Sequence, residues 1–177
     1  TARRGRGMET GGERSLGGTS GRGGRGEHEG ALAAAGVASV VAPVRRAWPA
    51  RPKLSSPQVD FGRLVPEASW WNADAVICTL GTTMKVAGSQ AAFRRVDHDY
   101  PLAVARLAHA HGTPTYVLNS AVGADAQSRF FYNRVKGELE RALEDEGYAS
   151  LTFVRPGLIG GEREEFRLGE RLLVSAL

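Results

Sequence analysis

The sequence predicts a single α/β domain built on a doubly wound, mostly parallel sheet. From residue 37 onward, apolar strand-like runs alternate with stretches of helical periodicity, and the links between them are short. This pattern is typical of right-handed βαβ units. The run ADAVICTLGTT, residues 73–83, stays apolar until Gly81 closes it, as in a strand buried on both faces. A length of 177 residues supplies one sizeable core and is too short for two.

The N-terminal part gives the weakest pattern. Residues 1–15 are expected to form a disordered tail and residues 16–177 the domain. The reason is that the Gly- and Arg-rich residues 1–30 contain almost no apolar side chains. Because the chain starts with Thr1 and stops within an apolar pattern, we expect a fragment of a longer reading frame, shortened at its C-terminal side.

The first strand after this segment is expected within ASVVAPV, ending at Pro43. The Pro- and Ser-rich stretch 46–64 predicts a loop with a short strand near Val59. The strand within residues 73–83 comes next, as described above.

Two helices and two strands complete the expected order. Residues 89–112 have helical spacing, although Pro101 must restart or kink that helix. TYVLNS, residues 115–120, is a strand; residues 129–147 form a second helix; and LTFVRPG, residues 151–157, is the last strand. Ligands of such sheets bind beyond the carboxyl ends of the strands, so the residues directly after each strand are the candidates for a site.

One such candidate set combines a serine, a tyrosine and a lysine. Tyr132 and Lys136 are four residues apart on a predicted helix, so they share a face one turn apart. An adjacent ammonium favours the phenolate form, which makes a tyrosine a usable acid and base near neutral pH. Ser120, at the end of the preceding strand, is placed to donate a hydrogen bond to a substrate carbonyl. The alternative is that Tyr132 packs in the core and Lys136 is a surface charge.

The residues also resemble a known family. Ser120, Tyr132 and Lys136 match the Ser…Tyr-x-x-x-Lys set of the short-chain dehydrogenase/reductase superfamily, whose fold is Rossmann-like. Three stretches look more narrowly like its atypical branch: residues 74–112, NSAVGADAQSRFFYNRVKGELE and VRPGLIGGEREEFRLGERL. That branch contains the Tat-interacting tumour-suppressor protein of animals and its bacterial homologues. The resemblance covers about residues 37–174.

The resemblance implies roles for these residues. Tyr132 would be the general acid and base, Lys136 would also hold the nicotinamide ribose, and Ser120 would orient the substrate. Residues 78–83 would lie against the adenosine and pyrophosphate side of the cofactor, and residues 155–157 would face the nicotinamide. The cofactor-binding candidates in these segments are Thr79, Leu80, Gly81, Thr82, Pro156 and Gly157. Without the resemblance, Gly81 and Pro156 are equally explained as residues that end a strand.

Arg45 and Arg46 follow the strand expected at residues 38–44, where a dinucleotide fold meets the adenine ribose. An acidic residue there accepts the ribose 2′-hydroxyl, whereas arginine suits a 2′-phosphate. The sequence therefore favours NADP over NAD as the cofactor. Paired arginines on a loop are also commonly just solvated.

The glycines at the N-terminal side are the point where the pattern departs from the family. Gly18, Gly21 and Gly24 have the Gly-x-x-Gly-x-x-Gly spacing of a pyrophosphate-binding turn. However, METGGERS, residues 8–15, is too polar for the buried central strand that should precede this turn. We therefore expect a degraded first βα unit and weak dinucleotide binding.

The expected function is a carbonyl/alcohol oxidoreductase, or a nucleotide-sugar epimerase or dehydratase, acting on an unidentified small-molecule substrate. The alternative is a non-catalytic regulator that binds NADPH and changes its partners, since fold does not settle function. An oligomer is compatible with the sequence.

Composition excludes or disfavours other classes. Cys78 is the single cysteine, and no Cys/His cluster has metal-ligand spacing, so no metal site is expected. No apolar run is long enough to span a membrane, and a cytoplasmic protein is expected. The basic N-terminal segment could bind phosphates, but no aromatic residues accompany its arginines, so nucleic acid is not the expected partner.

Overall fold

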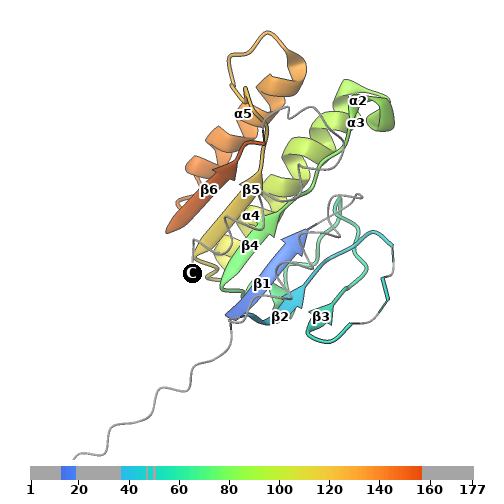
Figure 1. The fold of residues 1–177 in the computed structure, drawn as a ribbon, viewed down its shortest axis with the longest axis vertical. Helices are drawn as coiled ribbons and strands as arrows, with labels where there is room; N and C mark the ends of the chain where they lie inside the picture. Colours follow the sequence, from blue (N-terminus) through green and yellow to red (C-terminus); the bar gives the residue numbers. More distant parts are fainter. Residues whose placement is uncertain (1–12, 19–36, 47, 50, 157–177) are drawn as a thin grey trace, which may run out of the picture.

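The computed structural model describes residues 13–18, 37–46, 48, 49 and 51–156. It contains a six-stranded sheet in the order β3-β2-β1-β4-β5-β6, and every neighbouring pair is parallel (Figure 1). This order reverses between β1 and β4, as in doubly wound dinucleotide-binding folds. The α/β class predicted from the sequence is confirmed. The strands are β1 (Glu13–Gly18), β2 (Val37–Val41), β3 (Leu54–Ser55), β4 (Ala75–Cys78), β5 (Thr115–Asn119) and β6 (Ser150–Val154).

Strand β1 corrects an expectation. Its backbone pairs with β2 on one side and with β4 on the other, so residues 13–18 supply the central strand for which the sequence was expected to be too polar. The physical reason is that β2 and β4 would each present an open edge of unpaired backbone groups without a strand between them. The strand begins inside the stretch 1–15 expected to be a tail, so the domain starts no later than Glu13. Residues 1–12 lie outside the described residues.

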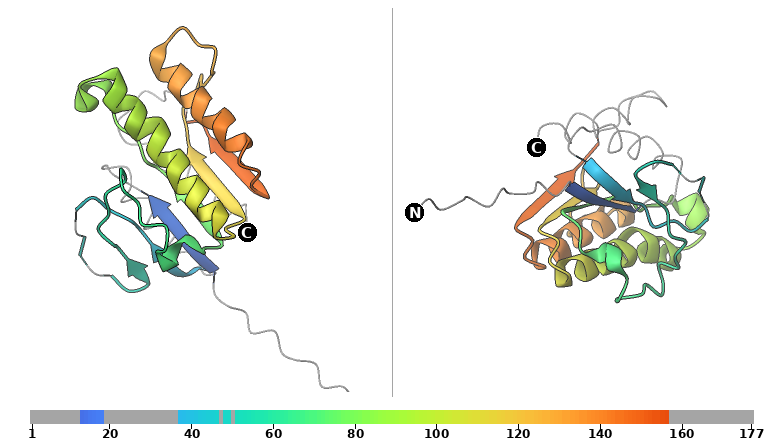
Figure 2. Two further views of the ribbon diagram at one scale, coloured as in Figure 1. Left: turned by 180° about the vertical axis from the view of Figure 1, so that it is seen from behind. Right: turned by 90° about the horizontal axis from the view of Figure 1, so that it is seen from below.

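Helices α4 (Tyr100–Ala110) and α5 (Phe131–Glu144) lie side by side on one face of the sheet (Figure 2). In α5 the buried Val135, Leu139 and Leu143 recur every fourth residue, which places them on one stripe facing the sheet. Most remaining positions are Arg, Lys and Glu, which are good helix formers; of these, Arg141 and Glu144 lie on the exposed outer face, whereas Lys136 and Glu140 are buried.

A continuous helical segment precedes α4. It comprises α3 (Gln90–Arg94) and the π-helical turn η2 (Arg95–Asp99), and α4 then starts at Tyr100. Pro101 has no N–H to donate to the carbonyl of Asp97, so the helix widens here and does not follow the regular i→i−4 ladder. The sequence predicted that Pro101 restarts or kinks this helix, and the structure shows a π-helical turn directly before α4, with Pro101 in the first turn of α4.

The short strand expected near Val59 lies earlier in the chain, at β3. Residues near Val59 still run beside β2, through an isolated parallel bridge between Val44 and Gln58. Two further short elements, η1 (Ser69–Trp71) and α2 (Met84–Ala87), flank β4 along the chain.

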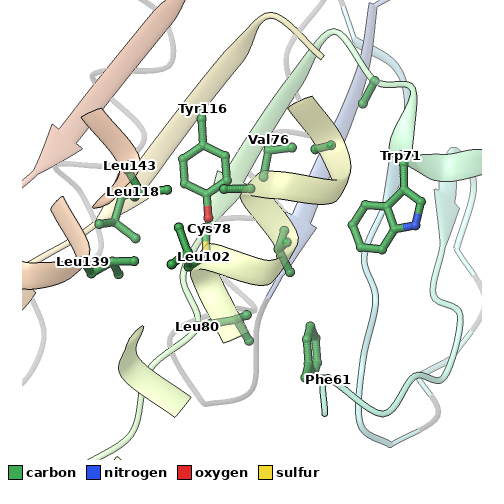
Figure 3. Packing of buried hydrophobic residues seen from close by; sticks show 14 residues of the cluster. Phe61, Trp71, Val76, Cys78, Leu80, Leu102, Tyr116, Leu118, Leu139 and Leu143 are labelled. Atoms are coloured by element: carbon green, nitrogen blue, oxygen red, sulfur yellow. The ribbon is translucent and has the colours of Figure 1, made fainter. Parts of the chain in front are cut away.

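The core lies between the sheet and its helices. Val76 and Cys78 of β4 and Tyr116 and Leu118 of β5 point to the helix-covered face (Figure 3). There they meet apolar side chains of α4, α5 and the loops: Leu102, Leu139, Leu143, Leu80, Phe61 and Trp71. This packing fixes the carboxyl ends of β4 and β5, where the predicted site residues lie.

Candidate functional site

The parallel sheet brings most of the predicted site residues to one side, the side at which the carboxyl ends of its strands lie; this side is called the carboxyl edge below. Gly18 ends β1 and is in register with Cys78 at the end of β4. Ser120 follows β5, and Pro156 lies two residues after β6. The sequence argument that these strand ends share an edge therefore holds for the described residues, while Gly21, Gly24 and Gly157 lie outside them.

Ser120 continues the pairing of β5 by one residue, because its N–H donates to the carbonyl of Val154 at 2.8 Å. Its side chain is buried, and among the described residues its hydroxyl has no hydrogen-bond partner. A buried hydroxyl without a partner has lost its hydrogen bonds to water and gained none in return. Such a group is suited to a ligand that completes its hydrogen bonding.

Tyr132 lies in the first turn of α5 and is 41% exposed. Its ring packs beside Phe93 of α3, with ring centroids 5.7 Å apart, and Phe93 also contacts Phe131 at 5.7 Å. The tyrosine is thus supported on one side by aromatic contacts and is open to solvent. It is not the buried core residue of the alternative interpretation.

Lys136, one turn further along α5, is buried and ion-paired. Its Nζ lies 2.8 Å from Oδ1 of Asp97, and the two side chains are 5% and 1% exposed. This excludes the interpretation of Lys136 as a surface charge. Burial raises the pKa of the Asp97 carboxyl, although the Lys136 ammonium and the Thr82 N–H act to lower that pKa.

The segment after β4 packs against this ion pair. The N–H of Thr82 donates to Oδ2 of Asp97 at 2.8 Å. A Cβ added to Gly81 would lie 3.4 Å from Asp97 Oδ1 and 3.9 Å from Lys136 Nζ, so the chain passes close to both charges here. The side chain of Leu80 is part of the core, which leaves its backbone as the part that can contact a ligand.

Asp97 is the member of this site that the sequence reasoning missed. The signal was present, because Asp97 lies four residues after Phe93 and so falls on the apolar stripe of its helix. An acidic residue on such a stripe needs a buried partner, and Lys136 provides it.

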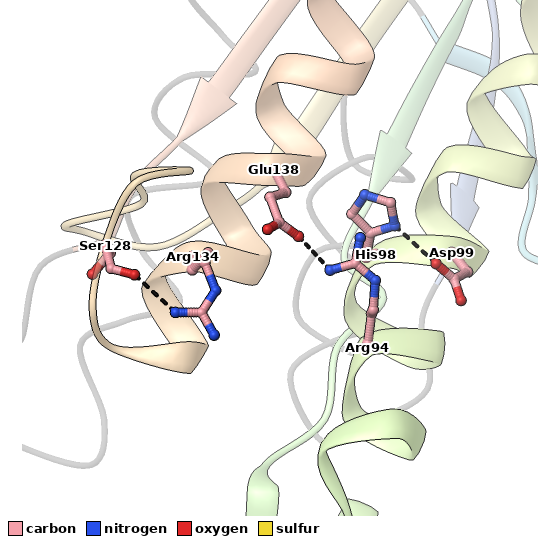
Figure 4. Close-up of polar contacts among 6 residues, drawn as sticks. All are labelled: Arg94, His98, Asp99, Ser128, Arg134 and Glu138. Carbon is pink, nitrogen blue, oxygen red and sulfur yellow. Dashed lines mark hydrogen bonds and ion pairs between the residues drawn. The ribbon is translucent and has the colours of Figure 1, made fainter.

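The connection from β5 to α5 is held tightly against the helix that carries Tyr132 and Lys136. Asp125 donates its N–H to the carbonyl of Asn133 at 3.0 Å. Arg134 donates to the carbonyl of Ser128 at 3.0 Å (Figure 4). These contacts fix the path of the chain between Ser120 and Tyr132.

The end of β6 is anchored to α5 as well. Arg155 forms a two-pronged ion pair with the buried Glu140, with Nε at 2.9 Å from Oε1 and the second nitrogen on Oε2. Hydrogen bonding and charge from Glu140 raise the pKa of Arg155. The pair places Pro156 at the same sheet edge as Ser120.

Arg45 and Arg46 follow β2 and are exposed. The carbonyl of Arg45 accepts a hydrogen bond from the side chain of Gln58 at 3.2 Å, which ties the backbone of this loop to the segment after β3. The structure therefore places both arginines at the β2 end of the edge, where the adenine ribose is expected, and leaves their role as a prediction.

Within the residues that the structure describes, no group of three or more His, Cys, Asp or Glu side chains is arranged to hold a metal ion. The same residues include no helix long and apolar enough to cross a membrane.

The chain is similar to several curated proteins. It is 46% identical over 94 residues to "Protein fmp52, mitochondrial" of Emericella nidulans, covering 53% of this chain and 40% of that protein. It is 43% identical over 115 residues to "Protein HTATIP2" of Rattus norvegicus, covering 64% of this chain and 47% of that protein. The chain thus spans less than half the length of these relatives. No protein-family model matches it.

These names correct one expectation. Several of the relatives are named as mitochondrial proteins, in Emericella nidulans, Coccidioides immitis, Aspergillus niger and Scheffersomyces stipitis. This finding contradicts the cytoplasmic location expected from the sequence.

Solved structures share the fold at low sequence identity. MoeE5 in complex with UDP-glucuronic acid and NAD superposes with a TM-score of 0.65 at 17% identity, over 81% of this chain and 54% of that chain. A Serratia marcescens short-chain dehydrogenase/reductase superposes with a TM-score of 0.63 at 14% identity, over 93% of this chain and 89% of that chain. Both support the Rossmann-like architecture.

Proposed function

Since the chain belongs to the atypical branch of short-chain dehydrogenases/reductases that contains HTATIP2 and FMP52, we propose that it binds a nicotinamide dinucleotide and interconverts a carbonyl and an alcohol. The observation that carries this proposal is the arrangement at the sheet edge. It combines a partly exposed Tyr132, a buried charged Lys136 one turn away, and a buried Ser120 hydroxyl without a partner among the described residues.

Each side chain has a separate task in this proposal. Tyr132 gives its proton to the carbonyl oxygen in the reductive direction and takes it back in the oxidative one. Ser120 donates a hydrogen bond to the same oxygen and so orients the substrate. Lys136 provides a positive charge beside the developing phenolate and, by the family resemblance, holds the nicotinamide ribose.

The residues fit a dinucleotide at this edge. The bound dinucleotide supplies or accepts the hydride at the carbonyl carbon. Gly81 leaves space beside Lys136 and Asp97 that a side chain would narrow, and Thr79 and Thr82 follow the same strand end. Gly18 ends β1 and Pro156 lies two residues after β6, on the side of the sheet where its strands end.

We further propose NADP as the preferred cofactor. Arg45 and Arg46 follow β2 and are exposed, and guanidinium groups suit a 2′-phosphate better than a 2′-hydroxyl. The structural neighbour MoeE5 is seen with NAD, so the preference rests on these two arginines alone.

A small carbonyl or alcohol compound is the proposed substrate. A nucleotide sugar is one class to test, because MoeE5 is seen with UDP-glucuronic acid and another neighbour, at 15% identity and a TM-score of 0.62, is a nucleoside-diphosphate-sugar epimerase from Agrobacterium tumefaciens.

The first test is a calorimetric titration of the purified chain with NADPH and with NADH. We expect saturable binding of both and tighter binding of NADPH. Replacing Arg45 and Arg46 together by serine should remove the preference and leave NADH binding unchanged. Arg141, which is exposed in the last turn of α5, serves as the control when replaced by serine. A folded protein that binds neither dinucleotide would refute the proposal.

A further inference from the structure

We propose that the substrate carries an apolar group beside its carbonyl, and that this group rests on a surface formed by Met84, Val86, Val122 and Phe130. The proposal rests on the carbonyl/alcohol function proposed above and names its substrate class. That class is an apolar aldehyde or ketone, or the matching alcohol, and not a nucleotide sugar.

Large hydrophobic side chains that are exposed gather at the carboxyl edge. Among the described residues, five of the six such side chains lie there, with exposed fractions of 40–79%: Met84, Val86, Val122, Phe130 and Tyr132. The sixth, Val65, lies beside η1, where its carbonyl accepts the Nε1–H of Trp71 at 2.8 Å, so it belongs to the region before β4 begins. Scattered exposed apolar residues are ordinary, but a group of them at one place indicates a binding surface.

Two of these side chains adjoin the residues that would hold the carbonyl. Val122 lies two residues after Ser120, and Phe130 lies two residues before Tyr132. Two residues of chain span at most about 7 Å. The apolar surface therefore borders the proposed reaction site on two sides of the loop that joins β5 to α5.

Two contacts bring the remaining segments to the same place. A Cβ added to Gly123 would lie 2.8 Å from Nδ2 of Asn133, so the chain directly after Val122 packs on the first turn of α5. The ring of Tyr132, in that same turn, packs beside Phe93 of α3, and α2, which carries the other two apolar side chains, packs against α3. Accordingly, α2 and the loop before α5 lie at the same end of the molecule (Figure 1).

Phe130 has a position that the fold alone does not explain. It is the N-cap residue of α5, with φ −80° and ψ 120°, and its side chain makes no capping hydrogen bond. Ser, Thr, Asp or Asn at this position would accept a backbone N–H of the first turn, which phenylalanine cannot do. The residue is also 75% exposed. A residue that breaks a local rule without a compensating contact is typical of a functional site.

Charged side chains are few along the same segments. Within residues 80–93 and 120–132 they are Lys85, Asp125 and Arg129. Oδ1 of Asp125 accepts the N–H of Gln127 at 2.9 Å. Lys85 and Arg129 are exposed and would suit the diphosphate of a nucleotide sugar. Four apolar side chains outnumber these two cations on separate segments, which favours the apolar substrate, and the test below separates the two classes.

The step assigned to an apolar ketone is its reduction to the alcohol. The carbonyl carbon accepts a hydride from NADPH, which is oxidised to NADP⁺, and the C=O π electrons move to the oxygen. That oxygen takes the phenol proton of Tyr132, and Tyr132 recovers a proton from water. The apolar group does not react. Its contact with the surface removes it from water and holds the carbonyl at Ser120.

The test uses the two methionines of the chain, Met8 and Met84. Protein labelled with ¹³C in the methionine methyl groups gives two signals, which Met8→Leu assigns. The wild type is titrated by NMR with 2-butanone, 2-octanone and UDP-glucose, each with and without NADPH. Absorbance follows the consumption of NADPH with the two ketones, and its formation from NADP⁺ with 2-octanol and with UDP-glucose.

We expect 2-octanone to shift the Met84 signal saturably and to leave the Met8 signal unchanged. Its affinity should exceed that of 2-butanone at least tenfold, because each fully buried methylene adds a factor of about four. UDP-glucose should not shift the Met84 signal at the concentrations at which 2-octanone saturates. A Met84 signal that does not respond to 2-octanone would overturn the proposal, and so would tighter binding of UDP-glucose than of 2-octanone.

Phe130→Ser removes the exposed ring and supplies a capping hydroxyl, and Arg129→Gln, its neighbour in the chain, is the matched control that removes a charge. Phe130→Ser should weaken 2-octanone binding at least fivefold, while its denaturation midpoint stays equal or rises because serine caps α5. Arg129→Gln should bind 2-octanone within twofold of the wild type. Val86→Thr tests the surface of α2 and should weaken binding at least twofold.

These variants can also contradict the proposal. Equal 2-octanone binding by Phe130→Ser and the wild type would remove the ring from the surface. A lower denaturation midpoint, or a failure to fold, in Phe130→Ser would show that the ring supports the fold, and the argument from its position would fall.

Two mixed outcomes separate this proposal from the function on which it rests. If 2-octanone binds through Phe130 but no compound consumes or forms NADPH, the apolar surface stands and the proposed reaction is refuted. If NADP⁺ is reduced with UDP-glucose and not with 2-octanol, the oxidoreductase function stands and the apolar substrate is refuted.

Discussion

Gly137 of α5 faces the backbone of Asp125 so closely that no side chain fits between them. A Cβ added to Gly137 would lie 2.2 Å from the carbonyl carbon of Asp125 and 2.2 Å from the nitrogen of Ala126. The glycine follows Lys136 directly in α5, so the loop between Ser120 and Tyr132 packs against the same turn of the helix that carries the lysine. Close backbone approach, and not helix preference, accounts for a glycine at this position.

Gly137→Ala is therefore expected to destabilise the protein by about 3 kcal/mol, although alanine is the better helix former, because the atoms that it meets are backbone. The loop must move away from α5, which would also displace Ser120 from Tyr132. Chemical denaturation gives the loss of stability. Gly147→Ala is the control, because a Cβ there has no heavy atom within 4 Å and meets only the strain of φ +75°, about 1 kcal/mol. Equal losses for the two variants would contradict the packing argument.

Because the hydroxyl of Tyr148 is partly buried, we expect the protein to lose stability at alkaline pH. This hydroxyl donates to the carbonyl of Ala105 at 2.6 Å, and burial, followed by the charge of Glu146, raises its pKa above the ordinary value. The folded protein thus retains this proton at a pH where the unfolded chain releases it. The contribution of the protonated Tyr148 to stability is complete below about pH 10. It falls as the pH rises further, by at most about 1.4 kcal/mol per pH unit.

Tyr148→Phe should cost about 1 kcal/mol at pH 7 through the lost hydrogen bond. Between about pH 10 and pH 12 its stability should decline less steeply than that of the wild type. Denaturation curves at closely spaced pH values measure both effects. Parallel declines in the wild type and the variant would show that the Tyr148 proton is not linked to folding.

The order of strands and helices could be predicted from the sequence because β4, β5, α4 and α5 each bury a clear apolar pattern. Val76 and Cys78 alternate along β4, and Leu139 and Leu143 recur at helical spacing in α5. The central strand β1 could not be predicted, because its place is determined by backbone pairing with β2 and β4, which no local side-chain pattern reveals.

The same contrast holds for the site. Tyr132 and Lys136 were found because their spacing on one helix is a local property. The contact of Lys136 with Asp97 joins residues 39 positions apart (136 − 97) and depends on the packing of η2 against α5. The ion pair is therefore a tertiary feature, and the sequence contained only its indirect sign, an acidic residue on an apolar stripe.

Substitution of Tyr132 is the experiment that most clearly distinguishes an enzyme from a non-catalytic regulator. Tyr132→Phe removes the proton that the proposed reaction transfers and keeps the ring contact with Phe93. We expect oxidoreductase activity to fall by about 100-fold or more, which is the usual contribution of a general acid or base, with NADPH affinity unchanged within about twofold. Tyr100→Phe, at the start of α4, is the matched control and should retain activity. Equal activity in Tyr132→Phe and the wild type would remove the tyrosine from the mechanism.

The buried hydroxyls of Ser120 and Thr113 are expected to differ in how much they contribute to stability. Thr113 donates to the carbonyl of Trp71 at 2.7 Å and accepts the N–H of Ala73 at 3.1 Å, so Thr113→Val should cost about 2 kcal/mol by leaving buried groups unpaired. Ser120 has no such partner in the described part of the chain, so Ser120→Ala should change stability by less than about 0.5 kcal/mol. Thermal unfolding compares the two directly. A large loss in Ser120→Ala would mean that its hydroxyl supports the fold, and the serine could no longer be regarded as a group reserved for a ligand.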